Sequence, residues 1–245
     1  MGIFLNSKSP YESYKRIRQN PYFVDKSLLL AELMPSFGSA DCYCCITRPR
    51  RFGKTIMANM IAAFLGKTDR NDEIFRDLAI SGRKGYSAHL HEHNVISIDF
   101  SRAPSGCKSY MQYISRIERG ITQDLLEAYP NCTIDQHDSV WDILQKIHER
   151  TDDRFLFVLD EWDAVFHMPF VSEAEQKEFL LFLKWLLKDQ PYVEFVYMTG
   201  VLPIAKYSSG SELNMFVEYD MATSEKFCEY FGFSDAETDL LYDAY

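Results

Sequence analysis

The residues with the clearest chemical meaning form one basic stretch, Arg48-Pro49-Arg50-Arg51-Phe52-Gly53-Lys54-Thr55. An apolar run over residues 42–46 leads into it, and a helix-like run over residues 56–65 leads out of it. A strand, a basic turn, Gly-Lys-Thr and a helix are the layout of a phosphate-binding loop. In such a loop, backbone N–H groups and the helix N-terminus hold the phosphates. The lysine reaches the β and γ groups, and the threonine hydroxyl ligates Mg²⁺.

The stretch departs from the usual pattern, G-x-x-x-x-G-K-[ST], because Arg48 stands where the first glycine is expected. That glycine normally permits a tight turn at positive φ. Pro49 fixes its own φ and biases Arg48 toward extended geometry, so we expect the loop to follow a more constrained path. Gly53, beside the lysine, is retained. The competing explanation is a basic turn that caps a helix without binding phosphate.

Two adjacent carboxylates, Asp160 and Glu161, directly follow the apolar run over residues 155–159. Such a run suits a strand that is buried on both faces of a parallel sheet. A carboxylate at the end of that strand is where a Mg²⁺-holding aspartate belongs, and its neighbour can orient or deprotonate an attacking water. We therefore predict Thr55 and Asp160 as the metal ligands, and Lys54 and Glu161 as the catalytic residues. A polar strand end is common in proteins, so this prediction depends on the loop.

A third polar group, Thr199, closes the strand-like run over residues 192–198. Its hydroxyl could contact the terminal phosphate or the attacking water, although a strand-end threonine without such a role is an equal alternative. We expect the arginine side chains of the loop to supplement the phosphate contacts that a glycine-rich backbone makes alone. The predicted nucleotide-binding residues are Arg48, Pro49, Arg50, Arg51, Phe52, Gly53, Lys54, Thr55, Ile56 and Thr199.

The elements that must position these groups are strands that alternate with helices. Strands are predicted at about residues 42–47, 94–100, 155–159, 192–198 and, more weakly, 215–219; helices are predicted at 55–65, 109–129, 139–149 and from 172 to 187. This alternation implies right-handed crossovers and a mostly parallel sheet with helices on both faces. Ligands bind at the carboxyl ends of the strands in such a sheet, which is where the loop lies.

We expect three parts along the chain. Residues 1–20 form an N-terminal arm with a short helix, residues 21–221 form the phosphate-loop domain, and residues 222–245 begin a helical region. Within that last region, Gly232 is expected to separate two short helices, and Ser234 to cap the second.

The composition is that of a globular chain, with 47% apolar residues and a net charge of −10. The acidic balance argues against broad binding of nucleic acid. Six cysteines without a C-x-x-C pair suit reduced thiols in a cytoplasmic protein. No signal peptide is indicated, and no apolar run approaches the ~20 residues that cross a membrane. His89, His91 and His93 alternate, but no carboxylate or cysteine pattern beside them supports a metal site, so a solvated loop is favoured.

Five motifs together resemble one bacterial protein family. They are Tyr22-Phe23-Val24-Asp25-Lys26-Ser27, the loop from Thr47 to Thr55, Leu159-Asp160-Glu161-Trp162-Asp163, the run from Met198 to Lys206, and Tyr230-Phe231-Gly232-Phe233-Ser234. The chain is similar over roughly residues 20–245 to the predicted AAA-ATPase-like proteins, which are often joined to a C-terminal PD-(D/E)XK nuclease-like domain. Arg-Pro-Arg-Arg-Phe-Gly-Lys is the most specific of these marks, and the first glycine is ordinarily absent in that family.

The resemblance implies an α/β fold, the three-layer sandwich of the P-loop NTPases, with strand order 5-1-4-3-2 and the 192–199 strand in the middle. It matches Lys54 and Thr55 to the phosphate and Mg²⁺ positions, Asp160 to the metal position, Glu161 to the catalytic position and Thr199 to the sensor position. Asp25 and Lys26 match a family motif that lies just before the first strand, where an approach to the nucleotide base is conceivable.

Two positions differ from the family. Trp162 stands where tyrosine is usual, which is a mild change, and Pro203 stands where arginine is common. If that arginine contacts phosphate or a neighbouring subunit, this chain lacks it, and fast hydrolysis is in question. The sequence ends at Tyr245 without the nuclease-like domain.

The predicted function is that of an ATP-binding, Mg²⁺-dependent ATP hydrolase that acts as a nucleotide-driven switch. The alternative is an ATP-binding scaffold with little or no hydrolysis. A P-loop kinase is disfavoured because Asp160 and Glu161 suit water activation and no separate acceptor-binding arginine cluster is visible. A nuclease or DNA-binding role rests on family association alone. ATP and Mg²⁺ are the expected cofactors, and a protein partner or self-association is left open.

Overall fold

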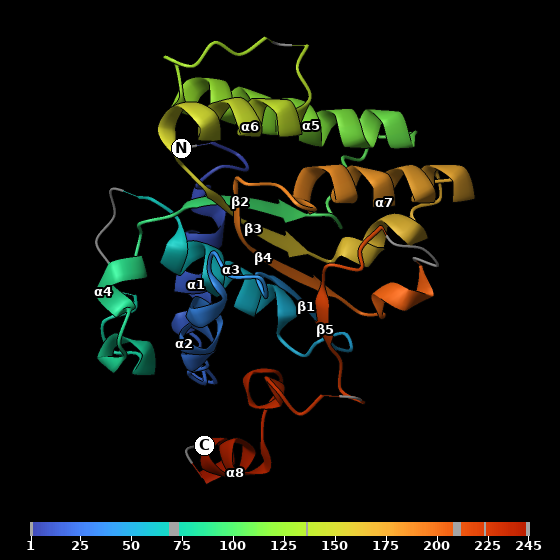
Figure 1. Ribbon diagram of the computed structural model, residues 1–245. Helices are drawn as coiled ribbons and strands as arrows, with labels where there is room; N and C mark the ends of the chain where they lie inside the picture. The colour runs from blue at the N-terminus through green and yellow to red at the C-terminus, as the bar shows by residue number, and fades with distance from the viewer. Residues whose placement is uncertain (1, 69–73, 136, 208–211, 223, 244–245) are drawn as a thin grey trace.

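The computed structural model of the protein describes residues 2–68, 74–135, 137–207, 212–222 and 224–243. Its centre is a five-stranded sheet in the order β2-β3-β4-β1-β5 (Figure 1). The strands are β1 (Tyr43–Thr47), β2 (Asn94–Asp99), β3 (Phe155–Asp160), β4 (Val193–Gly200) and β5 (Val217–Tyr219). All pairings between them are parallel. This is the predicted order 5-1-4-3-2 read from the other edge, with the predicted central strand in the middle.

Helices cover both faces of this sheet, which confirms the three-layer fold. The helices are α1 (Lys8–Arg18), α2 (Leu28–Leu33), α3 (Lys54–Leu65), α4 (Tyr86–His89), α5 (Tyr110–Ala128), α6 (Val140–Thr151), α7 (Glu173–Leu187) and α8 (Asp235–Asp243). In Figure 1, α5, α6 and α7 lie on one side of the sheet, and α1, α2 and α3 lie on the other. Every residue of β3 is buried, as expected for a strand between two helical layers.

Short 3-10 helices connect the main elements: η1 (Met34–Ser36), η2 (Ala79–Gly82), η3 (Trp162–His167), η4 (Ile204–Lys206) and η5 (Cys228–Tyr230). Local capping fixes where the long helices begin. Ser139 accepts a hydrogen bond from the N–H of Asp142 at the start of α6, and Ser172 and Glu175 form a capping box at the start of α7.

The N-terminal residues are attached to the sheet beside β2. Leu5 forms an antiparallel bridge with Ile96 of β2. The carboxylate of Asp124, on α5, accepts the backbone N–H groups of Ile3 at 3.1 Å, Phe4 at 2.6 Å and Leu5 at 3.0 Å. Helix α1 then packs along α3, so the first twenty residues lie against the phosphate-loop helix.

The C-terminal residues run from β5 through η5 to α8, which lies apart from the sheet in Figure 1. Ser234 begins α8 in the manner of a capping box: it accepts the N–H of Glu237 at 3.3 Å, and its own N–H binds the Glu237 carboxylate at 2.8 Å. A 3-10 turn precedes Gly232 and a helix follows it, which matches the two short helices expected there. The last two residues lie outside the described part.

Candidate nucleotide-binding site

The basic loop joins the end of β1 to the start of α3. Gly53 is the last residue before the helix and has φ of 82°, in the left-handed region that glycine adopts at little cost. Arg51 has φ of 72°. Arg48 is not among the described residues with positive φ. The loop therefore makes its left-handed turns at positions 51 and 53, and position 48 has no conformational need for glycine.

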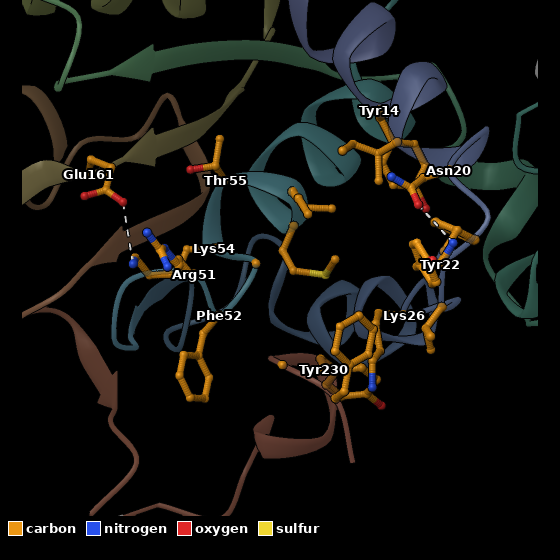
Figure 2. A pocket seen from close by; sticks show the side chains of 18 residues that line it. Tyr14, Asn20, Tyr22, Lys26, Arg51, Phe52, Lys54, Thr55, Glu161 and Tyr230 are labelled. Atoms are coloured by element: carbon orange, nitrogen blue, oxygen red, sulfur yellow. Dashed lines mark hydrogen bonds and ion pairs between the residues drawn. The ribbon is translucent and has the colours of Figure 1, made fainter. Parts of the chain in front are cut away.

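Lys54, the first residue of α3, spans the loop. Its side chain is buried, with the residue 4% exposed. The ammonium group donates to the carbonyl oxygen of Pro49 at 3.2 Å and lies 3.5 Å from Oε1 of Glu161. Figure 2 shows this ion pair between the loop and the end of β3. Two of the predicted catalytic residues, from segments far apart in sequence, therefore meet.

The predicted metal and sensor residues also meet. Thr199 donates its hydroxyl to Oδ1 of Asp160 at 2.5 Å, and the Thr55 hydroxyl lies close enough to the same carboxyl group to oppose the rise in its pKa. The N–H of Glu161 points to the Thr199 oxygen at 3.4 Å, while Glu161 itself takes φ of 52°. The register of the parallel strands places the ends of β3 and β4 side by side, so their terminal polar groups converge.

Burial raises the pKa of the Asp160 carboxyl, and nearby Asp99 and Glu161 add to the rise, although the Thr199 and Thr55 hydroxyls act against it. Within the described chain, no cationic side chain lies within ion-pair distance of Asp160. A buried carboxyl in this state lacks a compensating charge, which a cation beside Thr55 and Asp160 would supply. Among the described residues, no cluster of three or more His, Cys, Asp or Glu side chains forms a complete metal cage. Mg²⁺ fits this donor set, because it usually takes one or two protein oxygens and completes its shell with phosphate and water.

Asp163 ties the ends of β3 and β4 together. Its Oδ2 accepts the backbone N–H groups of Val201 at 3.0 Å and Leu202 at 3.1 Å. Gly200 is required at this junction, because a Cβ there would lie 2.5 Å from Nε1 of Trp162 and 2.9 Å from Oδ1 of Asp163. The tryptophan that replaces the usual tyrosine thus packs directly against the glycine, with Nε1 and Cδ1 of its ring nearest. This bracket keeps Thr199 next to the two carboxylates.

Arg48 is placed differently from the other loop residues. It is 1% exposed, and its guanidinium donates to the carbonyl oxygens of Thr47 at 2.8 Å and Tyr219 at 2.7 Å. The same group lies 5.2 Å from the ring centre of Phe231 and 3.8 Å from the sulfur of Cys228. Its side chain therefore binds the C-terminal segment, and the expected contact of this side chain with phosphate has no support in this arrangement. Arg50 and Arg51 are exposed and have no partner among the described residues.

A cavity of about 490 Å³ begins at the loop and continues between three parts of the chain. They are the start of α3, residues 14–26 from α1 to just before α2, and residues 230–233 of the C-terminal segment. Figure 2 shows Lys54, Thr55 and Glu161 at one end of it, and Tyr14, Asn20 and Tyr22 at the other. Its remaining lining is mainly apolar: Ile17, Phe23, Val24, Phe52, Ile56, Met57, Tyr230 and Phe233. Of the aromatic residues in this lining, only Phe52 was among the predicted nucleotide-binding residues, although several others fall within the motifs of the family resemblance.

Asp25 and Lys26 have separate roles. The Asp25 carboxylate accepts the N–H groups of Ser27 at 2.8 Å and Ala79 at 2.7 Å, so it fixes the turn before α2. Lys26 lines the cavity, and its ammonium group donates to the carbonyl of Glu229 at 2.6 Å and to the carboxylate of Glu237 at 2.5 Å. Lys26 thus binds the C-terminal segment to the wall of the cavity.

The three alternating histidines lie at the other end of the sheet. Nδ1 of His89 is 2.8 Å from Nε2 of His93, whose Nδ1 is 3.1 Å from the Glu194 carboxylate. Burial lowers the pKa of His89. The expectation of a solvated loop is therefore wrong, because the half-buried rings of His89 and His93 form a hydrogen-bonded chain with Glu194. They take no part in the candidate site.

Comparison with known proteins matches the pattern of one family, whose members are described as predicted AAA-ATPases, to residues 10–209. The chain belongs to the AAA-ATPase-like family. In this AAA-ATPase-like chain, the loop, the Asp160-Glu161 pair and Thr199 all fall within the matched region. The C-terminal partners of Arg48, which are Tyr219, Cys228 and Phe231, fall after it.

Among solved structures, the AAA-ATPase-like chain is similar to the ORC2 protein of Aeropyrum pernix, whose structure was determined in ADPNP and ADP complexes. The identity is 11% and the TM-score 0.37, over 85% of this chain and 47% of that one, so the similarity spans less than half of the archaeal chain. No curated protein matches the sequence. Among the described helices of the AAA-ATPase-like chain, none combines the length and apolar character needed to span a bilayer.

Pro203, the family position that is commonly arginine, follows β4 with φ of −59° and precedes η4. It does not line the cavity beside the loop. The adjacent N–H of Ile204 binds the Glu218 carboxylate at 3.0 Å. The described part of the AAA-ATPase-like chain therefore connects this position to β5, and an effect of the missing arginine on hydrolysis stays a prediction.

Proposed function

We propose that the protein binds ATP with Mg²⁺, hydrolyses it slowly and acts as a nucleotide-driven switch. The observation that carries this proposal is the convergence of Lys54, Thr55, Asp160, Glu161 and Thr199 at the carboxyl edge of the sheet. Two strand ends, those of β3 and β4, and the start of α3 contribute to it. The family and the fold support nucleotide binding, and the arrangement of these five side chains supports the proposal of Mg²⁺-dependent ATP hydrolysis.

The loop supplies the phosphate contacts. Its backbone turns at Arg51 and Gly53 and ends in the N-terminus of a twelve-residue helix, where N–H groups and the helix dipole favour anions. Lys54 is held between Pro49 and Glu161, and phosphate oxygens would compete with both for its ammonium group. Arg51 lines the cavity and pairs with no other described side chain. Of the cations in that state it is the nearest to Lys54 in sequence, and it could supplement these contacts.

Thr55 and Asp160 are the residues that would hold Mg²⁺. The ion would neutralise charge on the terminal phosphate oxygens. Thr199 keeps the Asp160 carboxylate in place through its 2.5 Å hydrogen bond. The Thr55 hydroxyl already lies close enough to the Asp160 carboxyl to act on its pKa, so the two donor groups are near each other.

Glu161 is suited to orient or deprotonate a water. Its carboxylate is partly exposed, and among the described side chains its one partner is Lys54, at 3.5 Å. When Lys54 turns to phosphate, that carboxylate is released at the edge of the cavity. The backbone N–H of Glu161 donates to the Thr199 hydroxyl oxygen, and this bond fixes the main chain of Glu161. The Glu161 side chain can therefore change partner without a change in the end of the strand.

The cavity beyond the loop suits a purine base. Tyr22, Phe23 and Tyr230 offer aromatic surface on which a base can stack. The side-chain amide oxygen of Asn20 accepts the N–H of Tyr22 at 2.9 Å. The NH₂ group of the same amide is left as a donor for a ring nitrogen. The lining is largely apolar with few polar groups, which is typical of sites for the base of a nucleotide.

Binding and turnover test the proposal separately. We expect wild type to bind ATP and release phosphate only with Mg²⁺, Lys54→Ala to lose binding, and Glu161→Gln to bind ATP but lose roughly 10²–10⁴-fold in turnover. The matched control is Lys67→Ala, a lysine beyond the end of α3. Equal ATP binding by wild type and Lys54→Ala would overturn the proposal.

The second candidate is an ATP-binding scaffold, favoured by proline at position 203. It predicts tight ATP binding, negligible phosphate release, and no effect of Glu161→Gln on either. The six free cysteines are in keeping with the cytoplasmic location that we expect for either function.

A further inference from the structure

A second cavity, of about 570 Å³, lies on the other side of Thr55. Residues 2–10, the first half of α3, the ends of β2 and β3, and α5 form its walls. Its chemically active lining residues are Lys8, Thr55, Asp99, Arg102, Arg116 and Asp160. Thr55 lines both cavities, so the second one meets the proposed nucleotide site at the threonine and aspartate that would hold the metal.

Among the described lining residues, the charges of this cavity that have no ion-pair partner are two cations, Lys8 and Arg116, and one carboxylate, Asp160. Asp99 is engaged by Arg102, whose Nε donates to its carboxylate at 2.6 Å, and by the N–H and hydroxyl of Ser101. In the described part of the chain, Lys8 and Arg116 form no ion pair or hydrogen bond through their side chains. They come from separate elements, α1 and α5, and both line the same space. Two unpartnered cations on one concave surface favour an anionic occupant.

The rest of the lining suits a small organic molecule rather than a bare ion. Hydroxyl and amide groups come from Ser7, Ser9, Ser97 and Asn59, and apolar surface comes from Phe4, Ile98, Val158 and Ala62. A charged rim with an apolar wall and several neutral donors is the usual form of a site that binds a small molecule with one anionic end.

We propose that this cavity binds a small organic phosphate, with the phosphate between Lys8 and Arg116. Arginine pairs with two phosphate oxygens at once, and lysine adds a mobile point charge. The hydroxyl groups of Ser7 and Ser9 begin α1 beside the same space. The binding itself is independent of the proposed ATPase function.

The wall that carries Lys8 is fixed, so the site does not depend on a mobile terminus. Asp124 holds three successive N–H groups of residues 3–5, and Phe4 packs so closely on Gly120 that a Cβ there would lie 2.3 Å from its ring. Leu5 joins the edge of β2. Helix α5 therefore positions the segment that carries Lys8, and the same helix carries Arg116.

If the proposed function holds, the second ligand and the nucleotide influence each other. Thr55 borders both spaces and Asp160 borders the second, so a phosphate compound beside them changes the environment of the metal ligands. Linkage requires the effect to be reciprocal: whatever factor the ligand applies to the affinity for Mg²⁺·ATP, the nucleotide applies to the affinity for the ligand.

The direct test measures inorganic phosphate binding by calorimetry at constant ionic strength. Because the loop can also bind phosphate, every variant carries Lys54→Ala. We expect residual phosphate binding in Lys54→Ala, roughly tenfold weaker binding after Arg116→Ala, and no change after Arg119→Ala. Arg119 is the matched control, since it lies one turn later on α5 and bonds to the backbone of its own helix.

Lys8→Ala repeats the test from the other wall and keeps it decisive if Arg116→Ala does not fold. Loss in both variants with retention in the control supports the site. Absence of phosphate binding in Lys54→Ala, or binding that neither Arg116→Ala nor Lys8→Ala weakens, overturns it. ATP binding by the protein with an intact loop, measured in parallel, shows independently whether the proposed nucleotide function stands.

Discussion

Thr199 hydrogen-bonds to Asp160 across two neighbouring strands, with 2.5 Å between the hydroxyl oxygen and Oδ1. The same hydroxyl oxygen accepts the N–H of Glu161. One buried threonine, 0% exposed, therefore holds both carboxylate residues at the carboxyl end of β3. This arrangement makes Thr199 the structural link between the proposed metal ligand and the proposed base.

We expect Thr199→Val to lower the free energy of unfolding by ~1–3 kcal/mol, because the near-isosteric side chain leaves buried polar partners unsatisfied. Thr199→Ser keeps the hydroxyl and is the matched control. Urea unfolding of the three proteins measures the difference. Equal stability of the valine and serine variants would show that the hydrogen bond has no energetic weight.

Asp160→Asn is expected to stabilise the metal-free protein at neutral pH. A raised pKa means that the folded state binds the proton more tightly than the unfolded chain, so ionisation costs stability as pH rises through the window between the ordinary value of 3.8 and the raised one. Asparagine removes that cost and retains an oxygen for Thr199. The melting temperature should rise by roughly 2–4 °C per kcal/mol relieved.

The test is a pH series of melting temperatures without metal. The gain from Asp160→Asn should be absent below pH 3.8, grow above it and then level off, whereas Mg²⁺ with ATP should stabilise wild type and Glu161→Gln but not Asp160→Asn. Glu161→Gln, at the partly exposed neighbouring carboxylate, is the control. A gain of equal size at every pH would contradict the assignment of this cost to Asp160.

Arg48→Ala should destabilise the protein by about 2–4 kcal/mol, because the change leaves two buried carbonyl groups without a donor and opens a cavity. The local effect should be faster amide exchange in β5 and residues 228–232, which Arg48 contacts. Arg50→Ala, at an exposed arginine, is expected to change neither. Unchanged exchange in these C-terminal residues would refute the coupling.

Gly200→Ala should cost ~1–3 kcal/mol, since its Cβ would overlap Trp162 and Asp163 and the surrounding backbone must shift. Altered tryptophan fluorescence should accompany the loss. Gly82→Ala is the matched control, because a Cβ at that glycine meets nothing within 4 Å. Similar stability of both alanine variants would show that the junction tolerates the added atom.

The sequence predicted what depends on local patterns. The run over residues 155–159 and the carboxylates after it were recognisable because a fully buried parallel strand has a continuous apolar signature. The family resemblance supplied the strand order, which no local pattern encodes. The side chains of Lys54 and Asp160 could be paired with their partners because parallel strands end at one edge.

Long-range side-chain contacts could not be predicted in this way. Arg48 reaches a carbonyl 171 residues later, and Lys26 reaches a carboxylate 211 residues later. Nothing in the residues near Arg48 distinguishes a guanidinium that turns inward from one that binds phosphate. The two cavities escaped prediction for the same reason, because each is lined by segments that meet only in the folded chain.

The contacts of Arg48 also show that the end of the family pattern and the end of the packed structure are different positions in the chain. The family pattern stops at residue 209, yet the acceptor for the buried guanidinium, Tyr219, and the ring beside it, Phe231, lie further along the chain. A fragment trimmed to the matched region would expose β1 along one edge and leave the buried guanidinium with only one of its two described carbonyl acceptors, that of Thr47. We therefore expect that the segment conserved enough to define a family is shorter than the segment that must be expressed to obtain a folded protein.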